Sequence, residues 1–226
     1  MLTVILAGGK STRFTHEGFP KQKHLLPMPD NRTLLEWQVE FLRPEKLVFI
    51  SRLEYKNSER TTLMKINRMV PSNFMTVWID KPTTGPLDGL LFARSLLNTD
   101  SELLISYNDE LVLHGVLQAM IDRCRKYNYV SALIAFNTDN PRFTPVPNRP
   151  GLFAGCTYWF RSGKDFLKKA KKLKVASDVG CPHVVYSFRH WYAHEAKKGE
   201  VIELGTAREY KMWAAKQGMT KERMGF

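Results

Sequence analysis

The chain has 226 residues, of which 43% are hydrophobic and 25% are charged, proportions typical of globular proteins. This composition excludes a disordered or collagen-like chain, and the length favours one sizeable domain spanning residues 1–226. The 34 lysines and arginines exceed the 22 aspartates and glutamates, which gives a formal net charge of +12. Such an excess predicts an anionic partner, which could be nucleic acid, a lipid surface or phosphorylated small molecules.

The apolar runs and the cysteines indicate the compartment. No uninterrupted apolar run approaches the roughly 18 residues of a transmembrane helix. Residues 1–9 lack the charged n-region of a signal peptide. Cys124, Cys156 and Cys181 are odd in number and form no CxxC pair, which argues against a disulfide framework and against a zinc site. We therefore expect a cytoplasmic protein that does not associate with membranes.

Short apolar runs alternate with amphipathic stretches along the chain. The apolar runs predict strands at residues 2–6, 46–51, 74–79, 103–107, 130–136, 153–160 and 201–204. The amphipathic stretches predict helices at residues 33–43, 59–69, 87–97, 112–126, 164–174, within 184–197 and at 206–217. This alternation is typical of βαβ units. We predict an α/β fold, with a Rossmann-like, mostly parallel or mixed sheet flanked by helices.

Two of the predicted helices begin with a capping box, in which Thr33 and Thr206 are each followed three residues later by a glutamate. The stretch between residues 137 and 152 is rich in proline and predicts a loop, because proline cannot donate to a β-ladder. His190 and His194 have the spacing of two zinc ligands on a predicted helix, but no third ligand is evident nearby. A packed structural helix is the better interpretation. A solvated outer face likewise explains the lysine-rich helix at 164–174 better than binding of nucleic acid or lipid.

A glycine pair follows the first predicted strand. Ligands bind at the carboxyl ends of strands in α/β sheets, so this loop, LAGGKSTR, is the first candidate site. Two glycines let the backbone approach a ligand closely, and exposed N–H groups with nearby hydroxyls form a cradle for an anion. Neither the GxxxxGK[ST] spacing of a P-loop nor the GxGxxG spacing of a dinucleotide site is present.

The segments that follow make the loop more specific. PKQKHLLP at residues 20–27 precedes the helix TLLEWQVEFL. The combination resembles the N-terminal signature of the sugar nucleotidyltransferases (NDP-sugar pyrophosphorylases), LAGGxGTR followed by PKxLLP and a helix. The resemblance implies a GT-A-like nucleotidyltransferase fold. It also implies that Arg13 stabilises the leaving pyrophosphate and that Lys23 contacts the phosphate and sugar-phosphate groups. The implied nucleotide-binding residues of the loop are Leu6, Ala7, Gly8, Gly9, Ser11, which replaces the usual glycine, and Thr12.

Two later stretches fall where this resemblance places the rest of the nucleotide site. Residues 82–89 look like the loop and helix start that contact the base, which makes Thr84 and Gly85 candidates. The strand at 103–107 runs into Asn108 and Asp109, and it looks like the strand whose final Gly-Asp pair binds magnesium. Asn108 then stands at the glycine position beside the nucleotide, and Asp109 keeps the carboxylate.

The C-terminal half contributes the acceptor and the second metal ligand in this interpretation. Residues 153–158 are similar to the family's Asn-Ala-Gly-Ile-Tyr strand, which makes Gly155 and Thr157 candidate acceptor-binding residues. Glu203 begins a turn that resembles the Asp-x-Gly-Thr turn whose aspartate completes the magnesium site. A glutamate is one methylene longer, so oxygen ligation is retained while the ion could shift. Mg²⁺ is the implied cofactor.

One family feature is missing. Between residues 136 and 153 the chain lacks the Glu-Lys-Pro segment whose lysine holds the sugar phosphate. Arg142 or Arg149 could supply the charge, but no motif aligns either of them. We therefore expect an acceptor pocket that is reduced or different.

The resemblance implies a Mg²⁺-dependent nucleotidyltransferase that moves a nucleoside monophosphate from an NTP to a sugar phosphate or similar phosphorylated acceptor and releases pyrophosphate. Its implied partners are these two small molecules, nucleic acid is not expected, and a homo-oligomer is left open. A glycosyltransferase that uses an NDP-sugar is the first alternative, although its typical Asp-x-Asp pair is absent at residues 108–110. A basic, catalytically lapsed binding protein is the second.

Overall fold

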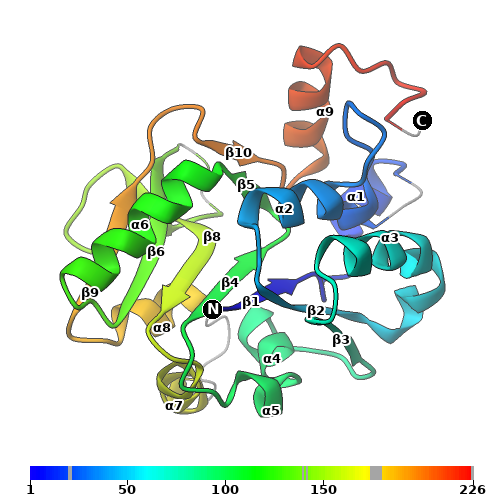
Figure 1. The fold of residues 1–226 in the computed structure, drawn as a ribbon. Helices are drawn as coiled ribbons and strands as arrows, with labels where there is room; N and C mark the ends of the chain where they lie inside the picture. Colours follow the sequence, from blue (N-terminus) through cyan, green and yellow to red (C-terminus); the bar gives the residue numbers. More distant parts are fainter. Residues whose placement is uncertain (20–21, 139, 141, 174–179, 225–226) are drawn as a thin grey trace.

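The computed structural model describes residues 1–19, 22–138, 140, 142–173 and 180–224. Within these residues an eight-stranded sheet lies between two layers of helices (Figure 1). The strands are β1 (Leu2–Leu6), β2 (Lys46–Arg52), β3 (Phe74–Ile79), β4 (Leu103–Tyr107), β5 (Glu110–Val112), β6 (Ser131–Asn137), β7 (Thr144–Pro145), β8 (Leu152–Phe160), β9 (Trp191–Glu195) and β10 (Val201–Glu203). The α-helices are α1 (Thr12–His16), α2 (Leu34–Leu42), α3 (Lys56–Met69), α4 (Pro86–Leu91), α5 (Arg94–Leu97), α6 (His114–Lys126), α7 (Gly163–Leu173), α8 (Cys181–Tyr186) and α9 (Ala207–Lys216). Pro20 and Lys21 of the predicted signature and Lys174 of the predicted lysine-rich helix lie outside the described residues.

The sheet is mixed and mostly parallel. Its strand order is β3-β2-β1-β4-β8-β6-β9, and β7 pairs with β8 beside this path. β1 pairs in parallel with both β2 and β4, and β3 extends the parallel half beyond β2. β8 runs antiparallel between β4 and β6. The predicted fold class, a Rossmann-like mixed sheet flanked by helices, is therefore confirmed.

Alternate residues of β1 supply two separate apolar cores, because successive side chains of a strand point to opposite faces. Val4 packs in the core formed with α4, α5, α7 and α8, whereas Ile5 packs in the core formed with α2, α3 and α6. Cys124 and Cys156 lie in the second of these cores and Cys181 in the first, all as free thiols. The sheet is packed on both faces, so the loops that leave the ends of its strands start from fixed positions.

The C-terminal helix α9 packs on a third apolar core, together with residues of α1 and α2. Both predicted capping boxes form, with the hydroxyls of Thr33 and Thr206 each accepting from the N–H of the glutamate three residues on. The hydroxyl of Tyr210 in α9 donates to the carbonyl oxygen of Pro27 at 2.5 Å. This contact ties the C-terminal helix to the segment that follows the glycine loop.

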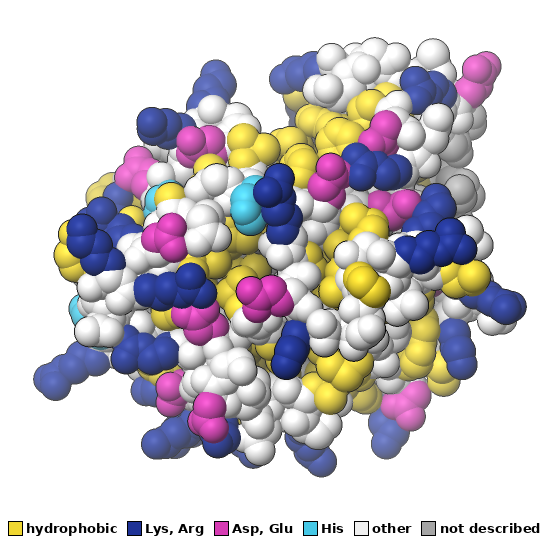
Figure 2. All heavy atoms as spheres, viewed as in Figure 1, with side chains coloured by type: hydrophobic (Ala, Val, Ile, Leu, Met, Phe, Trp, Pro, Cys, Tyr) yellow, Lys and Arg dark blue, Asp and Glu magenta, His cyan; other side chains and the backbone are white. Residues whose placement is uncertain are grey.

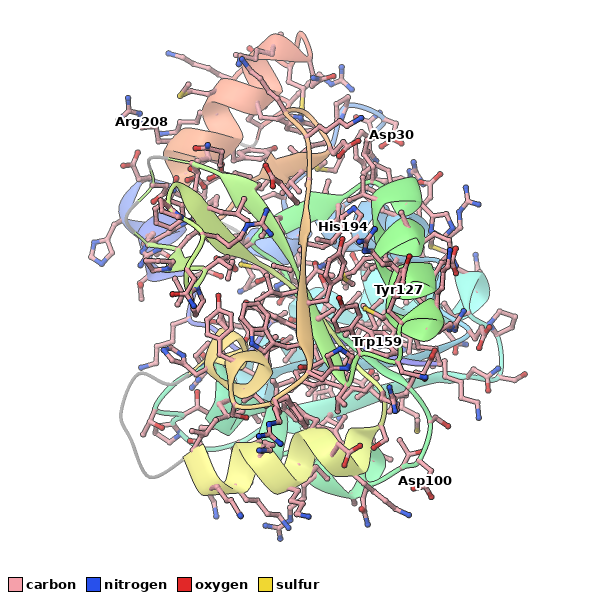
Figure 3. The ribbon with its side chains drawn as sticks, turned by 90° about the vertical axis from the view of Figure 1, so that its left-hand side faces the viewer. Asp30, Asp100, Tyr127, Trp159, His194 and Arg208 are labelled. Atoms are coloured by element: carbon pink, nitrogen blue, oxygen red, sulfur yellow. The ribbon has the colours of Figure 1, made fainter. Side chains whose placement is uncertain are left out.

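The helix predicted within residues 184–197 is wrong over most of its length. Helix α8 ends at Tyr186, and Trp191–Glu195 forms the edge strand β9, which pairs in parallel with β6. Aromatic side chains such as Trp191 and Tyr192 favour a half-buried strand surface, and this preference outweighs the apparent helical period. Figure 3 labels His194 on this strand, so His190 and His194 do not share a helix face.

Two smaller predictions also differ from the structure. The helix predicted at residues 87–97 is divided into α4 and α5. The predicted proline-rich loop contains the two-residue strand β7, in which Pro145 is opposite Phe153 of β8. Proline is tolerated there because this short strand lies beside the main strand path, where the missing N–H breaks no continuous ladder. No helix within the described residues is long and apolar enough to span a bilayer.

Candidate active site

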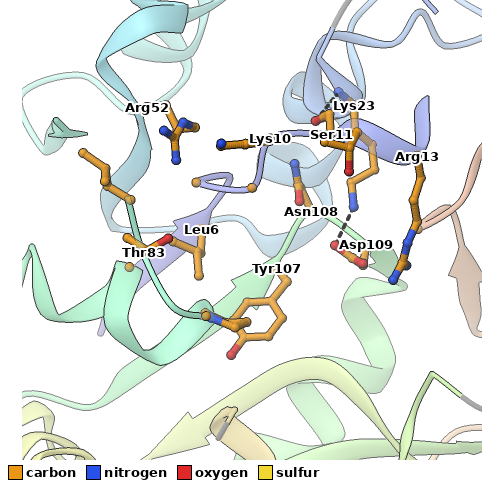
Figure 4. A pocket seen from close by; sticks show the side chains of 18 of the residues that line it. Leu6, Lys10, Ser11, Arg13, Lys23, Arg52, Thr83, Tyr107, Asn108 and Asp109 are labelled. Atoms are coloured by element: carbon orange, nitrogen blue, oxygen red, sulfur yellow. Dashed lines mark hydrogen bonds and ion pairs between the residues drawn. The ribbon is translucent and has the colours of Figure 1, made fainter. Parts of the chain in front are cut away.

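The glycine loop and Asp109 meet at one edge of the sheet because β1 and β4 are parallel neighbours. Leu6, the last residue of β1, is paired in register with Tyr107, the last residue of β4. Both chains therefore leave the sheet at the same edge, where ligands bind in α/β folds. Figure 4 shows the result, with Arg13 of the glycine loop close to Asp109.

A cavity of about 520 Å³ opens at this edge, and we call it the first cavity. The predicted nucleotide-binding residues on its wall are Leu6, Gly8, Gly9, Ser11, Thr12, Thr84, Gly85 and Asn108. Arg13, Lys23 and Asp109 also line it. Ala7 does not, since it is 2% exposed and packs in the apolar core on the α2 side of the sheet. The structure thus gathers segments from distant parts of the chain around one space.

The glycine loop passes close to the apolar side of the first cavity. A Cβ atom at Gly8 would lie 2.7 Å from Cδ1 of Ile79, so any side chain there would have to displace Ile79. Ser11 has a left-handed backbone, with φ at 52°, and turns the chain into α1. Its Oγ accepts a hydrogen bond from the N–H of Lys23 at 3.3 Å. The loop is thereby joined to the turn that carries Lys23.

Lys23 and Asp109 form the ion pair at the centre of the site. The Lys23 Nζ lies 2.5 Å from Oδ1 of Asp109, and the Lys23 residue is only 7% exposed (Figure 4). Burial alone would raise the pKa of Asp109, but the Lys23 ammonium and the guanidinium groups of Arg142 and Arg13 more than offset burial. The pKa of Asp109 is therefore lowered from its ordinary value, and the carboxylate is charged at neutral pH.

A buried polar cluster beside Lys23 was not found from the sequence. The Nε2 of His24 lies 2.6 Å from Oε1 of Glu59, and the hydroxyl of Ser51 donates to the same oxygen at 2.5 Å. All three residues are fully buried. The cluster attaches the short 3₁₀ turn Lys23–Leu25 to α3 and β2. The available signal was a histidine at the start of the apolar part of the signature, HLLP.

Arg52 is a second residue that sequence reasoning missed. It lines the first cavity, and its side chain is 11% exposed. Its Nε donates to Oε1 of Glu54 at 2.8 Å. Figure 4 shows its guanidinium beside Lys10 of the glycine loop. The signal was its place directly after a predicted strand, where ligand-binding residues gather in this fold.

A second cavity of about 280 Å³ adjoins the first, and the two share Arg13, Pro86, Tyr107 and Asp109 on their walls. Gly155, a predicted acceptor-binding residue, lines this second cavity. Thr157 does not, because it is fully buried, with its hydroxyl 3.3 Å from that of Ser106. The ion pair at Asp109 therefore stands where the two spaces meet.

Glu110 lies directly behind the wall formed by Gly155. Its Oε1 accepts a hydrogen bond from the N–H of Cys156 at 2.6 Å, and the residue is 1% exposed. Burial raises the pKa of Glu110 to about 8, and the neighbouring charge of Asp109 adds to the effect. A Cβ atom at Gly155 would lie 2.9 Å from both carboxyl oxygens, so this glycine provides the room for Glu110. Glu110 was not predicted as a site residue, because the apolar residues that follow it suggest an ordinary strand.

The antiparallel pairing of β5 with β10 brings Glu203 opposite Glu110, next to Asp109. The guanidinium of Arg142 lies among the carboxylates, with nitrogens 3.9 Å from Oδ2 of Asp109, 3.9 Å from Oε2 of Glu203 and 3.1 Å from Oε2 of Glu209. Burial, followed by the charge of Glu209, raises the pKa of Glu203. No group of three or more His, Cys, Asp and Glu side chains in the described part of the chain is arranged to hold a metal.

The two arginines considered for the missing charge have different surroundings. Arg142 lines the second cavity, whereas Arg149 is 46% exposed and pairs with Glu195 on the edge strand at 2.6 Å. Other basic side chains are similarly spread over the surface. Lys164 of α7 pairs with Asp100, and the face in Figure 2 shows acidic side chains among dispersed lysines and arginines. The basic excess therefore forms no single large patch on that face.

Cavities at the carboxyl ends of the strands are typical of α/β proteins that bind ligands, and comparison with known proteins identifies the family. Residues 3–195 match the model of the MobA-like NTP transferase domain. The chain belongs to this family and is a nucleotidyltransferase. No curated protein sequence matches it.

Solved structures of similar fold were also found. A nucleoside-diphosphate-sugar pyrophosphorylase from Vibrio cholerae RC9 is 16% identical with a TM-score of 0.76, over 95% of this chain and 100% of that one. A Bacillus anthracis protein described as a glucose-1-phosphate thymidylyltransferase is 14% identical with a TM-score of 0.78, over 99% of both chains. A UDP-glucose pyrophosphorylase from Acinetobacter baumanii is 15% identical with a TM-score of 0.69, over 99% and 95%. At these identities the likeness concerns the fold.

Proposed function

We propose that the protein transfers a nucleoside monophosphate from an NTP to a sugar phosphate or a similar phosphorylated acceptor and releases pyrophosphate. The observation that supports this most is the position of Lys23, Asp109 and Arg13 between a larger and a smaller cavity. The NTP occupies the first cavity and the acceptor the second. The names of the three structural neighbours, all enzymes of nucleotide–sugar chemistry, support the same reaction.

Both reactants are anions, so the tasks of the site are alignment and charge neutralisation. The backbone of the glycine loop holds the triphosphate, and Arg13 offers a planar fork to the leaving phosphates. Lys23 places a compact positive charge near the transferring phosphorus. The acceptor phosphate is already largely ionised near neutral pH, since its second pKa is about 6, so no general base is needed.

Asp109 and Glu203 are the residues that would hold Mg²⁺. Magnesium prefers oxygen ligands and commonly takes one or two carboxylates together with phosphates and water. Each of these carboxylates lies 3.9 Å from a nitrogen of the Arg142 guanidinium, so the two flank a position that one cation already occupies. When bound, the ion supplies neutralisation of the α-phosphate charge and a template for the two reactants. Lys23 offsets the remaining charge on Asp109.

The size and lining of the second cavity indicate the kind of acceptor that it can hold. The second cavity is about 280 Å³, and its wall carries Arg142 in place of the family lysine that the chain lacks. Gly155 leaves the strand backbone open to this cavity. We propose a small phosphorylated acceptor, and further propose that residues 1–226 form a single cytoplasmic nucleotidyltransferase-like domain that acts without nucleic acid.

A pyrophosphate-release assay tests the proposal. Each of the four ribonucleoside triphosphates is combined with Mg²⁺ and a panel of sugar phosphates. The wild type and the Asp109→Asn variant are assayed under the same conditions. We expect acceptor-dependent release in the wild type and a loss of at least about 100-fold in the variant. Release that is indifferent to the acceptor, or an Asp109→Asn variant with wild-type turnover, would contradict the reaction or the site. NDP-sugar consumption without NTP consumption would favour the glycosyltransferase alternative.

A further inference from the structure

Arg142 is placed where a single cation contacts both proposed metal ligands. Its two outer nitrogens each lie 3.9 Å from a carboxylate oxygen, one of Asp109 and one of Glu203. A third carboxylate, that of Glu209, is 3.1 Å away. The guanidinium therefore stands between the carboxylates toward which a divalent ion would be drawn.

Electrostatics holds this guanidinium more than hydrogen bonding does. Its three nitrogen atoms are buried, and none makes a hydrogen bond within the described part of the chain. The guanidinium carbon lies 4.5 Å from the centre of the Phe143 ring, a cation–π contact that supports one face. A guanidinium held by charge and by stacking on a ring can move away when a metal ion binds the carboxylates in its place.

Gly205 provides the room that lets Arg142 reach this position. A Cβ atom at Gly205 would lie 1.8 Å from Nη1 of Arg142 and 2.5 Å from its Cζ. The side chain of Arg142 and one alanine methyl at position 205 cannot both be accommodated as the structure stands. The backbone of Gly205 is not in the left-handed region, so alanine there introduces no conformational strain.

The charges next to the proposed metal ligands are matched in number before any metal enters. Lys23, Arg13 and Arg142 face the carboxylates of Asp109, Glu203 and Glu209, three positive charges against three negative. A divalent ion entering this balanced site meets the repulsion of Arg142 at short range, where charges interact strongly. Removing Arg142 leaves one uncompensated negative charge for the ion to bind.

We propose that Arg142 is an internal cation that competes with divalent metal for Asp109 and Glu203, so that metal binding requires the guanidinium to move. The second cavity, whose wall Arg142 already forms, is the space available to it. This inference rests on the proposed function for the identity of the metal ligands. It concerns the behaviour of one residue of this chain toward the ion, which can be measured without turnover.

Titration of the nucleotide-free protein with Mn²⁺, followed by the electron paramagnetic resonance signal of the free ion, tests the proposal. We expect Arg142→Gln to bind Mn²⁺ about tenfold tighter than the wild type, since a positive charge near both ligands is removed. Arg149→Gln is the matched control, because it removes an arginine whose partner is exposed Glu195, and it should bind like the wild type. Adding Asp109→Asn to Arg142→Gln should abolish the gain.

Gly205→Ala gives a second test, because it keeps the charge of Arg142 but forces its guanidinium away from the carboxylates, and it should also tighten Mn²⁺ binding. If circular dichroism shows that Arg142→Gln does not fold, the Mn²⁺ affinity of Gly205→Ala alone tests the proposal. Wild-type affinity in Gly205→Ala and in any folded Arg142→Gln would overturn the proposal.

Pyrophosphate release by the wild type, measured on the same preparation, distinguishes a failure of this proposal from a failure of the proposed function. Unchanged Mn²⁺ affinity with intact release refutes only the competition, whereas tighter Mn²⁺ binding with no release for any substrate pair refutes only the proposed function.

Discussion

Replacing Glu110 with glutamine is expected to remove much of the pH dependence of stability between pH 5.5 and 7.5. The residue is 1% exposed, and Oε1 of its carboxyl accepts a hydrogen bond from the N–H of Cys156. Its other oxygen has no partner within the described residues. Burial raises the pKa to about 8, against 4.5 for an ordinary glutamate. The folded protein therefore holds a proton on Glu110 that the unfolded chain has already released over this pH range.

The sign and size of the effect follow from proton linkage. Because the folded state binds more protons than the unfolded state between pH 4.5 and about 8, the contribution to stability is full below pH 4.5 and falls as the pH rises. Each pH unit inside this window lowers the free energy of unfolding by about 1.4 kcal/mol. From pH 5.5 to 7.5 the wild type should lose about 3 kcal/mol more than Glu110→Gln, whose amide does not titrate and still offers an oxygen to Cys156.

Urea unfolding at pH 5.5, 6.5 and 7.5 measures this difference. Glu222→Gln, which removes an exposed carboxyl near the C-terminus, serves as the control and should parallel the wild type. Comparing the slopes of stability against pH cancels the contributions of all other titrating groups. Parallel slopes for the wild type and Glu110→Gln would refute the view that Glu110 is a neutral buried acid.

Other substitutions test the ion pair, the buried cluster and the first capping box. Lys23→Ala should lower turnover by about 10²–10³-fold in the pyrophosphate-release assay while the protein stays folded, and wild-type turnover would refute its catalytic role. Glu59→Ala leaves the Ser51 hydroxyl and the His24 ring without their partner, so the free energy of unfolding in urea should fall by about 2–6 kcal/mol. Thr33→Ala removes a formed capping box and should lower it by about 1 kcal/mol, and an unchanged value would show that the cap contributes nothing.

The parts of the site that could be predicted from the sequence are those encoded within a few neighbouring residues. The glycine loop, Lys23 and Asp109 each follow or neighbour a short apolar run, and the signature around them is local. Parallel pairing of β1 with β4 then brings the predicted groups together. The same locality explains why both capping boxes were predicted correctly.

The parts that could not be predicted depend on contacts between distant segments. β5 and β10 pair across about ninety residues of chain and bring Glu203 next to Asp109, where Arg142 contacts both, and no local pattern signals this. In the sequence, Glu110 is only the first residue of a short apolar strand. Its burial depends on the room that Gly155, forty-five residues later, leaves for its carboxyl group. The strand β9 was predicted as a helix because its aromatic residues fit either period, and only the free edge of β6 decides between them.

The reaction itself can be followed by ³¹P nuclear magnetic resonance of the protein with an NTP, Mg²⁺ and the acceptor that the release assay selects. The proposed chemistry predicts that the α-phosphate of the NTP appears in a new diphosphate linked to the acceptor, in equal amount to free pyrophosphate. Lys23→Ala under the same conditions should form neither product at a comparable rate. Loss of the NTP signals without the new diphosphate, or an unchanged spectrum for every acceptor tested, would contradict nucleotidyl transfer to a phosphorylated acceptor.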